Sequence, residues 1–280
     1  MTRVDLSDLK AWIGRSETTV DTVTAAPAAG LAAMLDRAAP GLGAPLPPLW
    51  HWIYFTPRAA QAELGADGHP RLGGFMPPIP LPRRMWAGGR LVFHDPLRIG
   101  DEAERHTELI GLNAKEGSQG ALVFVTLRHS IRTARGLAIE EEQDLVYRPA
   151  EATGAPARIT SEMQAEWRDS IDPDPRLLFR YSALTFNAHR IHYDLPYAQA
   201  VEGYPGLVVQ GPLTATLLAD RLLAHRTGRL TRFAFRGRSP LFAGVPMVLC
   251  GAGAGTLWAE ADGGAVAMTA EAVMEAGDAD

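Results

Sequence analysis

The sequence has a single cysteine and no excess of positive charge, and each of these features excludes a class of protein. The one cysteine, Cys250, can form neither an internal disulfide nor a cysteine-based zinc site, and its apolar surroundings VPMVLCGAGAG indicate that it fills a core. The 27 Lys and Arg residues stand against 32 Asp and Glu, a net charge of −5. A nucleic-acid-binding domain shows a clear basic excess instead, so we expect no nucleic-acid partner.

Long apolar runs are also lacking. None approaches the ~20 residues of a bilayer-spanning helix, and the start MTRVDLSDLK lacks the apolar stretch of a secretory signal, so we expect a cytoplasmic protein that binds no membrane. What is present is ordinary globular composition, with 46% hydrophobic and 21% charged residues. The 280 residues exceed the roughly 100–150 of a common domain, which predicts one large domain or two fused ones.

The first half is predicted to contain helices, a long loop and antiparallel strands. A helix should begin near Pro27, because proline is favoured in the first turn. Residues 56–90 are rich in proline and glycine, and a long ordered loop of this kind is usually functional. The predicted helices lie within 5–14 and 19–38, and the predicted strands are 50–55 and four alternating segments between 90 and 149.

The second half is predicted to repeat that plan after a polar stretch, with the boundary near residue 155. A helix followed by strands occurs in each half, as expected if two copies of one α+β unit are fused. The predicted elements are a strand at 177–186, helices at about 196–201 and 212–225, and strands at 230–238, 246–262 and 264–274.

A polar loop in the second half carries the side chains best suited to catalysis. Asn187, His189, His192 and Asp194 lie close together between predicted regular elements, and Gly211 opens the long predicted helix. Loops anchored on rigid elements often carry catalytic groups.

This loop resembles the signature of the (R)-specific enoyl-CoA hydratases and MaoC-like dehydratases. In that family Asp-x-Asn-Pro-x-His is followed by x-Asp and later by a glycine that starts the central helix of a hot-dog fold. The resemblance makes His192 the catalytic histidine and Gly211 the helix-start glycine, and it places Asn187 where the family has its catalytic aspartate. His189 and Arg190 depart from the signature, because the family has Asn and Pro there.

Three stretches of the first half are Asp67-Gly-His-Pro, Gly73-Gly-Phe-Met-Pro-Pro and Arg83-Arg-Met-Trp-Ala-Gly-Gly. They resemble a subgroup that contains fungal and mitochondrial-type hydroxyacyl-thioester dehydratases and bacterial mesaconyl- and itaconyl-CoA hydratases. The resemblance implies an α+β fold, a fused double hot-dog. Residues 1–154 would form a non-catalytic hot-dog that shapes the acyl and CoA pocket, and residues 155–280 the catalytic one.

Adding water to a double bond conjugated to a thioester needs a base, a proton for the α-carbon and donors for the enolate-like oxygen. An imidazole that titrates near ~6.5 can take and return a proton, so His192 suits the first two tasks. Asn187 is expected to orient the water through its amide oxygen while the backbone holds its NH2 group. Asp194 either caps the next short helix or substitutes for the missing aspartate. The first N–H groups of a helix lack internal partners, so Gly211 is expected to present one to the thioester oxygen.

Two neighbouring arginines of the first half are candidate substrate ligands. Arg83 and Arg84 can clamp a substrate carboxylate or a CoA phosphate, since guanidinium groups bind both bidentately; a solvated loop start is the alternative. Trp86, His189 and Arg190 are further candidate contacts, with a structural role as the alternative for His189. Six arginines also lie between 221 and 238, either to hold adenosine phosphates or because the chain uses Arg far more than Lys.

The spacing His189-x-x-His192 fits a metal pair, but neither a carboxylate nor a third histidine is predicted beside it, so we expect no metal. The resemblance implies reversible hydration of a 2-enoyl thioester, most specifically a short dicarboxylic acyl-CoA such as mesaconyl-CoA or itaconyl-CoA. We expect a homodimer and no cofactor besides the CoA of the substrate. Three alternatives stay open: a dehydratase of longer 3-hydroxyacyl chains carried by CoA or acyl-carrier protein, a hot-dog thioesterase, and a catalytically silent acyl-CoA-binding protein.

Overall fold

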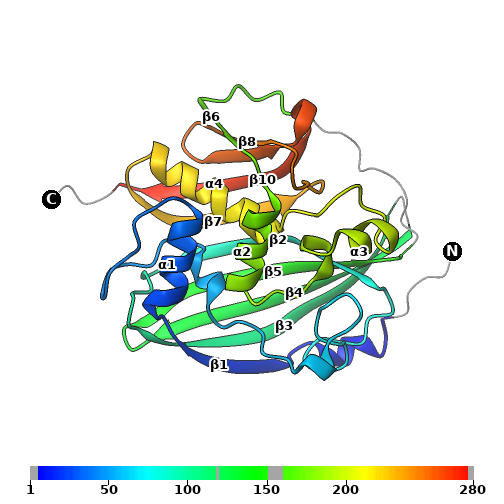
Figure 1. The fold of residues 1–280 in the computed structure, drawn as a ribbon. Helices are drawn as coiled ribbons and strands as arrows, with labels where there is room; N and C mark the ends of the chain where they lie inside the picture. The colour runs from blue at the N-terminus through cyan, green and yellow to red at the C-terminus, as the bar shows by residue number, and fades with distance from the viewer. Residues whose placement is uncertain (1–5, 118–119, 151–159, 277–280) are drawn as a thin grey trace.

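Ten strands pair in one antiparallel sheet within residues 6–117, 120–150 and 160–276, the part of the chain that the computed structural model describes (Figure 1). Their order is β1-β3-β4-β5-β2-β7-β10-β9-β8-β6, so five strands of the first half are followed by five of the second. The strands are β1 (Ser16–Thr22), β2 (Arg83–Phe93), β3 (Glu102–Gly117), β4 (Gly120–Thr133), β5 (Gly136–Arg148), β6 (Trp167–Ile171), β7 (Arg229–Gly237), β8 (Met247–Ala252), β9 (Thr256–Glu260) and β10 (Val266–Glu275).

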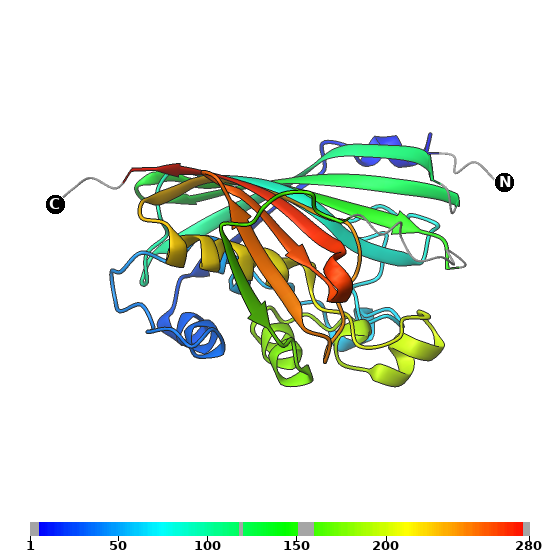
Figure 2. The same ribbon diagram turned by 90° about the horizontal axis from the view of Figure 1, so that it is seen from above.

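The helices lie on one side of this sheet, which curves around them (Figure 2). They are α1 (Ala25–Met34), α2 (Pro175–Leu184), α3 (Leu195–Ala200) and α4 (Gly211–His225). Most residues of α4 are buried, as expected of a helix that a sheet wraps. The main core contains residues of α1, α2 and α4 together with strands of both halves, so the two halves share one interior.

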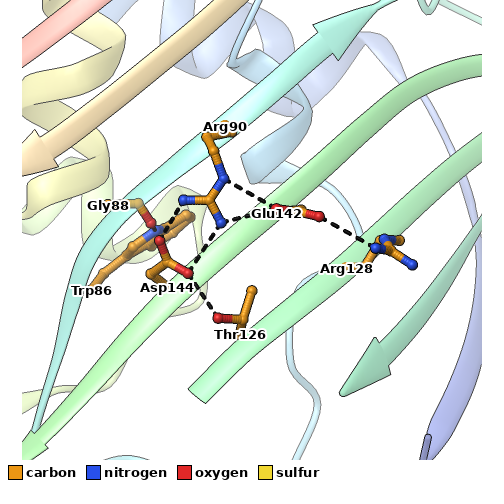
Figure 3. Close-up of polar contacts among 7 residues, drawn as sticks. All are labelled: Trp86, Gly88, Arg90, Thr126, Arg128, Glu142 and Asp144. Carbon is orange, nitrogen blue, oxygen red and sulfur yellow. Dashed lines mark hydrogen bonds and ion pairs between the residues drawn. The ribbon is translucent and has the colours of Figure 1, made fainter. Parts of the chain in front are cut away.

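The two halves meet where β2 pairs with β7, from Gly88 opposite Arg236 to Val92 opposite Arg232. A Cβ built on Gly88 would lie 2.5 Å from the carbonyl oxygen of Phe235, so a glycine is needed for β7 to approach this closely. On its other edge β2 pairs with β5, where the Arg90 guanidinium donates hydrogen bonds to Glu142 and Asp144 (Figure 3). β2 is therefore the seam strand of the molecule.

Many predicted elements are confirmed. The first helix begins two residues before Pro27, and the predicted strands of 90–149 correspond to the later part of β2 and to β3, β4 and β5. The helices near 196–201 and 212–225 are α3 and α4, and the strands at 230–238 and 264–274 are β7 and β10. Cys250 is fully buried, as predicted.

Two predicted strands are wrong. Within 50–55 the residues Trp50–Ile53 form a 3-10 helix. Leu49 before it and Phe55 after it have positive φ values of 68° and 52°, which are not compatible with a strand. The aromatic rings of 50–55 are buried in the main core, which any backbone shape can achieve. Residues 177–186 belong to α2, because Asp174 caps the helix by accepting from the N–H of Leu177 and Pro175 occupies its first turn.

Other boundaries also differ. β1 and β6 were not predicted, and 246–262 is two strands, β8 and β9, separated by a turn at Gly253 with φ 57°. Within 5–14 only Leu9–Trp12 is helical, as a 3-10 turn. β2 begins at Arg83, inside the predicted loop. The domain boundary predicted near residue 155 lies outside the described residues. No helix in the described ranges is long and apolar enough to cross a membrane.

Candidate active site

A cavity of about 2050 Å³ is lined by residues of both halves. The first half contributes the loop between Phe55 and β2 and the start of β2, and the second half contributes the segment after α2 and the start of α4. Pockets for small ligands usually measure about 300–1,000 Å³, so this one has room for a longer molecule. The predicted catalytic residues Asn187, His192 and Gly211 all line it.

His192 is held as a neutral base. It ends the 3-10 turn Arg190–His192, its side chain is buried, and its Nδ1 lies 2.7 Å from the carbonyl oxygen of Val208. A carbonyl only accepts, so Nδ1 carries the proton and Nε2 keeps its lone pair. Burial, with a smaller contribution from the neighbouring His69, lowers the pKa of His192 from the ordinary 6.5 to about 4. The imidazole is therefore uncharged at neutral pH, with its one proton on Nδ1.

Asn187 does not orient its amide in the predicted way. Its backbone N–H donates to the carbonyl of Ser182, and its side-chain Oδ1 accepts from the N–H of His189 at 3.0 Å. The oxygen is thus bound within the loop, because the adjacent backbone group is a donor and only the amide oxygen can accept from it. The predicted arrangement, in which the backbone holds the NH2 group, is therefore wrong: the backbone holds the oxygen, and the NH2 group remains as the donor of this side chain.

Gly211 is the first residue of α4, directly after the capping position Gln210. Gln210 donates from Nε2 to the carbonyl of Leu178 and to Oγ of Ser182, both at 2.9 Å, and so ties the start of α4 to α2. A Cβ on Gly211 would make only an ordinary 3.7 Å contact with the carbonyl oxygen of Trp86. The backbone at this helix start is consequently reachable from the cavity, and the first N–H groups of a helix have no internal acceptors.

A second cluster, from the first half, lies beside these residues. Asp67 accepts from the Nδ1–H of His69 at 2.9 Å and from its backbone N–H at 3.0 Å. The ring of His69 lies 4.1 Å from that of His189, and His189 lies 5.3 Å from His192, measured between ring centroids. Burial and the Arg84 charge lower the pKa of His69 to about 4, and burial also lowers the pKa of His189. Three neutral imidazoles therefore line one wall of the cavity.

Backbone contacts hold the two loops together. Gly68 has φ +91°, and a Cβ there would lie 1.8 Å from the carbonyl oxygen of Ala188. The N–H of Arg190 donates to the carbonyl of Asp67 at 2.9 Å, and its guanidinium donates to the carbonyl of Ala66. Only a glycine permits this approach, so the position of Asp67 and His69 depends on Gly68.

The cluster changes the metal prediction. Within the described ranges, Asp67, His69 and His189 form one group whose ligand atoms all lie within 4.8 Å of one another. The expectation that no carboxylate or third histidine lies beside His189 is therefore wrong, because the fold brings them from the first half. Asp67 and His69 are already bonded to each other at an ordinary hydrogen-bond distance, which needs no ion.

The predicted substrate ligands divide into two sets. Arg84 and Trp86 line the cavity, and so does Arg83, whose Nε lies 3.2 Å from Glu202. Arg190 does not line it, so its predicted substrate contact is not supported. Its guanidinium is bound by Asp194, which also caps α3 by accepting from the N–H of Tyr197.

Of the two predicted roles of Asp194, the structure therefore supports the helix cap. Asp194 does not line the cavity, where a substitute for the catalytic aspartate would have to lie. Within the six-arginine run, Arg236 and Arg238 line the cavity, whereas Arg221, Arg226 and Arg229 pair with acidic residues elsewhere. Sequence reasoning missed the Asp67–His69 pair as site residues, although Asp67-Gly-His-Pro stood out within the long loop.

The continuous sheet of both halves around a buried helix defines a double hot-dog protein. A MaoC-like dehydratase of solved structure aligns with a TM-score of 0.67 at 15% identity, covering 95% of this chain and 99% of that one. A Mycobacterium tuberculosis protein described as having a double hotdog fold aligns with a TM-score of 0.58 at 15% identity, covering 94% and 96%. The predicted fold class is confirmed.

The sequence model of hydroxyacyl-thioester dehydratase type 2 matches residues 49–243, and the chain belongs to this family. Mesaconyl-C(4)-CoA hydratase of Chloroflexus aurantiacus is 51% identical over 87% of this chain and 88% of that protein. The mitochondrial hydroxyacyl-thioester dehydratase type 2 of Schizosaccharomyces pombe is 31% identical over 76% and 80%. The chain is accordingly a hydro-lyase of acyl thioesters, as the resemblance implied.

Proposed function

We propose that the protein reversibly hydrates a short dicarboxylic 2-enoyl-CoA of the mesaconyl or itaconyl type. The observation that carries the proposal is the bond from His192 Nδ1 to the carbonyl of Val208, three residues before α4 begins at the cavity. It leaves Nε2 as a base in the cavity that Gly211 also lines, where the first backbone N–H groups of α4 can bind the thioester oxygen. The relative named mesaconyl-C(4)-CoA hydratase supports the choice of acyl group.

In the proposed reaction His192 takes a proton from water through Nε2 as the oxygen bonds to the β-carbon. The electron pair of the double bond moves to the α-carbon and the thioester oxygen, whose charge the N–H groups at Gly211 stabilise. The imidazolium then returns the proton to the α-carbon. The thioester supplies the electron sink, so we propose that no resident metal or organic cofactor takes part.

For the substrate carboxylate we propose Arg84 as the principal ligand. Arg83 already faces Glu202, whereas the Arg84 charge lowers the pKa of His69, Asp67 and His189 and is therefore close to the histidine wall. A guanidinium there can hold a carboxylate bidentately.

A panel of charged and neutral enoyl-CoA esters, with mass detection of the gain of water, tests this assignment. Mesaconyl-CoA should be hydrated faster than crotonyl-CoA. Arg84→Gln should remove most of that preference, whereas Arg128→Gln, on the exposed surface outside the cavity, should leave it unchanged.

Faster turnover of long neutral chains would favour the dehydratase alternative. Release of free thiol from an enoyl-CoA would favour the thioesterase. Tight CoA binding without turnover would favour the silent binding protein.

We also propose that the protein is a homodimer in the cytoplasm, and light scattering should give twice the 30.2 kDa chain mass. A monomeric mass would contradict the dimer.

A further inference from the structure

The loop lacks a free carboxylate, but one from the other half of the chain, Asp67, holds His69, which lines the cavity. Asn187 occupies the position where the resembling signature has an aspartate. Asp194 is bound to Arg190 and, as the cap of α3, accepts from the N–H of Tyr197. Neither of them supplies a free carboxylate to the cavity. Asp67, about one hundred and twenty positions earlier, is bonded to His69, and His69 shares the cavity with His189 and His192.

His69 and His192 are held in matching ways. Each donates from Nδ1 to a fixed oxygen, Asp67 Oδ2 at 2.9 Å and the Val208 carbonyl at 2.7 Å. Each therefore keeps its lone pair on Nε2. The two acceptors differ in charge, because a carboxylate stabilises an imidazolium more strongly than a carbonyl does.

We propose that the Asp67–His69 pair of the first half completes the catalytic site of the second, with His69 as the second acceptor for the attacking water. This inference rests on the proposed hydration. One hydrogen of the water passes to Nε2 of His192 while the oxygen bonds to the β-carbon, and the same proton later goes to the α-carbon. The other O–H donates to Nε2 of His69 and remains in the product as its hydroxyl. Asp67 is a positioning residue that fixes the tautomer of His69.

Asp67→Asn is the decisive variant. The new side chain still offers an oxygen to the backbone N–H of His69, but its NH2 group would donate to Nδ1 and place the proton on Nε2. His69 would then point a donor at the water. The corresponding exchange in serine proteases, which leaves geometry intact, lowers kcat by about 10⁴. We expect kcat to fall by at least about 10² with KM nearly unchanged, and His69→Ala to fall similarly.

The matched control is Glu140→Gln, which alters another short histidine–carboxylate pair, with His94 at 2.7 Å, on the exposed surface. It should leave kcat unchanged. Melting temperature and affinity for a saturated acyl-CoA should stay close to wild type in Asp67→Asn; a parallel loss of both would show a structural role only and overturn the inference.

Normal kcat in Asp67→Asn or His69→Ala, with wild-type enzyme hydrating its substrate, would overturn the inference and leave the proposed function standing. No hydration by the wild-type enzyme would overturn both. Loss of activity on dialysis against EDTA, restored by Zn²⁺, would assign Asp67, His69 and His189 to a metal and overturn the hydrogen-bonded pair.

Discussion

Gly68 and Ala188 touch across the two halves of the chain, with the Cα of one directly against the carbonyl of the other. A Cβ on Gly68 would lie 1.8 Å from that carbonyl oxygen. This contact sets the position of the loop that carries Asp67 and His69 relative to the loop that carries His189 and His192. The geometry of the site therefore depends on a close approach of two backbone segments.

Gly68→Ala should therefore damage the site more than the fold. The substitution forces the two loops apart, and a displacement of about 1 Å can cost about 10² in rate. We expect kcat/KM to fall by that order. Gly73→Ala is the control, because Gly73 also has a positive φ of 96° but no atom within 4 Å of its Cβ position. It shares only the backbone strain, about 1 kcal/mol of stability. Equal activity losses in the two variants would contradict the docking argument.

The pH dependence of activity should lack the usual histidine limb. Because burial lowers the pKa of His192 to about 4, its Nε2 is already free of a proton at pH 5.5. We expect kcat/KM to be level from about pH 5.5 to 8 and to decline only as the pH approaches 4. Rapid-mixing assays at each pH would record this before the protein unfolds. A limb centred near 6.5 would show that His192 is solvated in solution.

The same histidines make the fold sensitive to acid. The pKa values of His69, His189 and His192 are lowered by burial from the ordinary 6.5, so between about pH 6.5 and 4 the unfolded chain binds more protons than the folded one. The free energy of unfolding should fall as the pH is lowered through this window and be unaffected by these groups above it. Urea midpoints against pH measure it. His189→Asn should flatten the slope, and an unaltered slope would contradict the assignment.

Gly211→Val should remove activity without unfolding the protein. The added Cβ meets only an ordinary 3.7 Å contact, but a branched side chain at this cavity-lining residue should keep the thioester away from the first N–H groups of α4. Loss of one oxyanion donor costs about 10²–10³ in kcat. Gly206→Val, at a glycine that does not line the cavity, should keep its activity. Unchanged turnover in Gly211→Val would exclude this helix start as the oxyanion site.

The seam between the halves should depend on backbone packing more than on ion pairs. Arg90 is half-exposed, so Arg90→Ala should cost less than about 1 kcal/mol although it bonds two carboxylates (Figure 3). Gly88→Ala should cost about 1–3 kcal/mol, because its Cβ would crowd the carbonyl of Phe235. Chemical denaturation of both variants compares them. A larger loss from Arg90→Ala would reverse this ranking.

Local patterns in the sequence predicted α4 and most of the long strands. The helix at Gly211 carries its own signals, with Pro212 in the first turn and apolar residues throughout. The strand predicted at 177–186 was wrong because the apolar run was interpreted without Asp174 and Pro175, the helix-start signal that lies just before it. The strand predicted at 50–55 was wrong because Leu49 and Phe55 adopt the left-handed conformation. Neither is Gly or Asn, the residues that would have indicated it in the sequence.

The candidate site was predictable only as far as one loop extends. His192, Asn187 and Gly211 lie within one stretch of sequence, and the structure places all three at one cavity. The Asp67–His69 pair joins them through a contact between distant loops, which no local periodicity encodes. The direction of the Asn187 amide likewise depends on the N–H of His189, a detail of loop geometry.

The seam at β2 and β7 has a consequence for the separated halves. Either half alone would present the inner edge of a ten-stranded sheet to solvent, with a row of unpaired N–H and C=O groups. Such an edge is a template for pairing with other chains. Fragments divided between the halves should therefore precipitate when produced singly and become tractable when produced together, since each supplies the missing neighbour of the other.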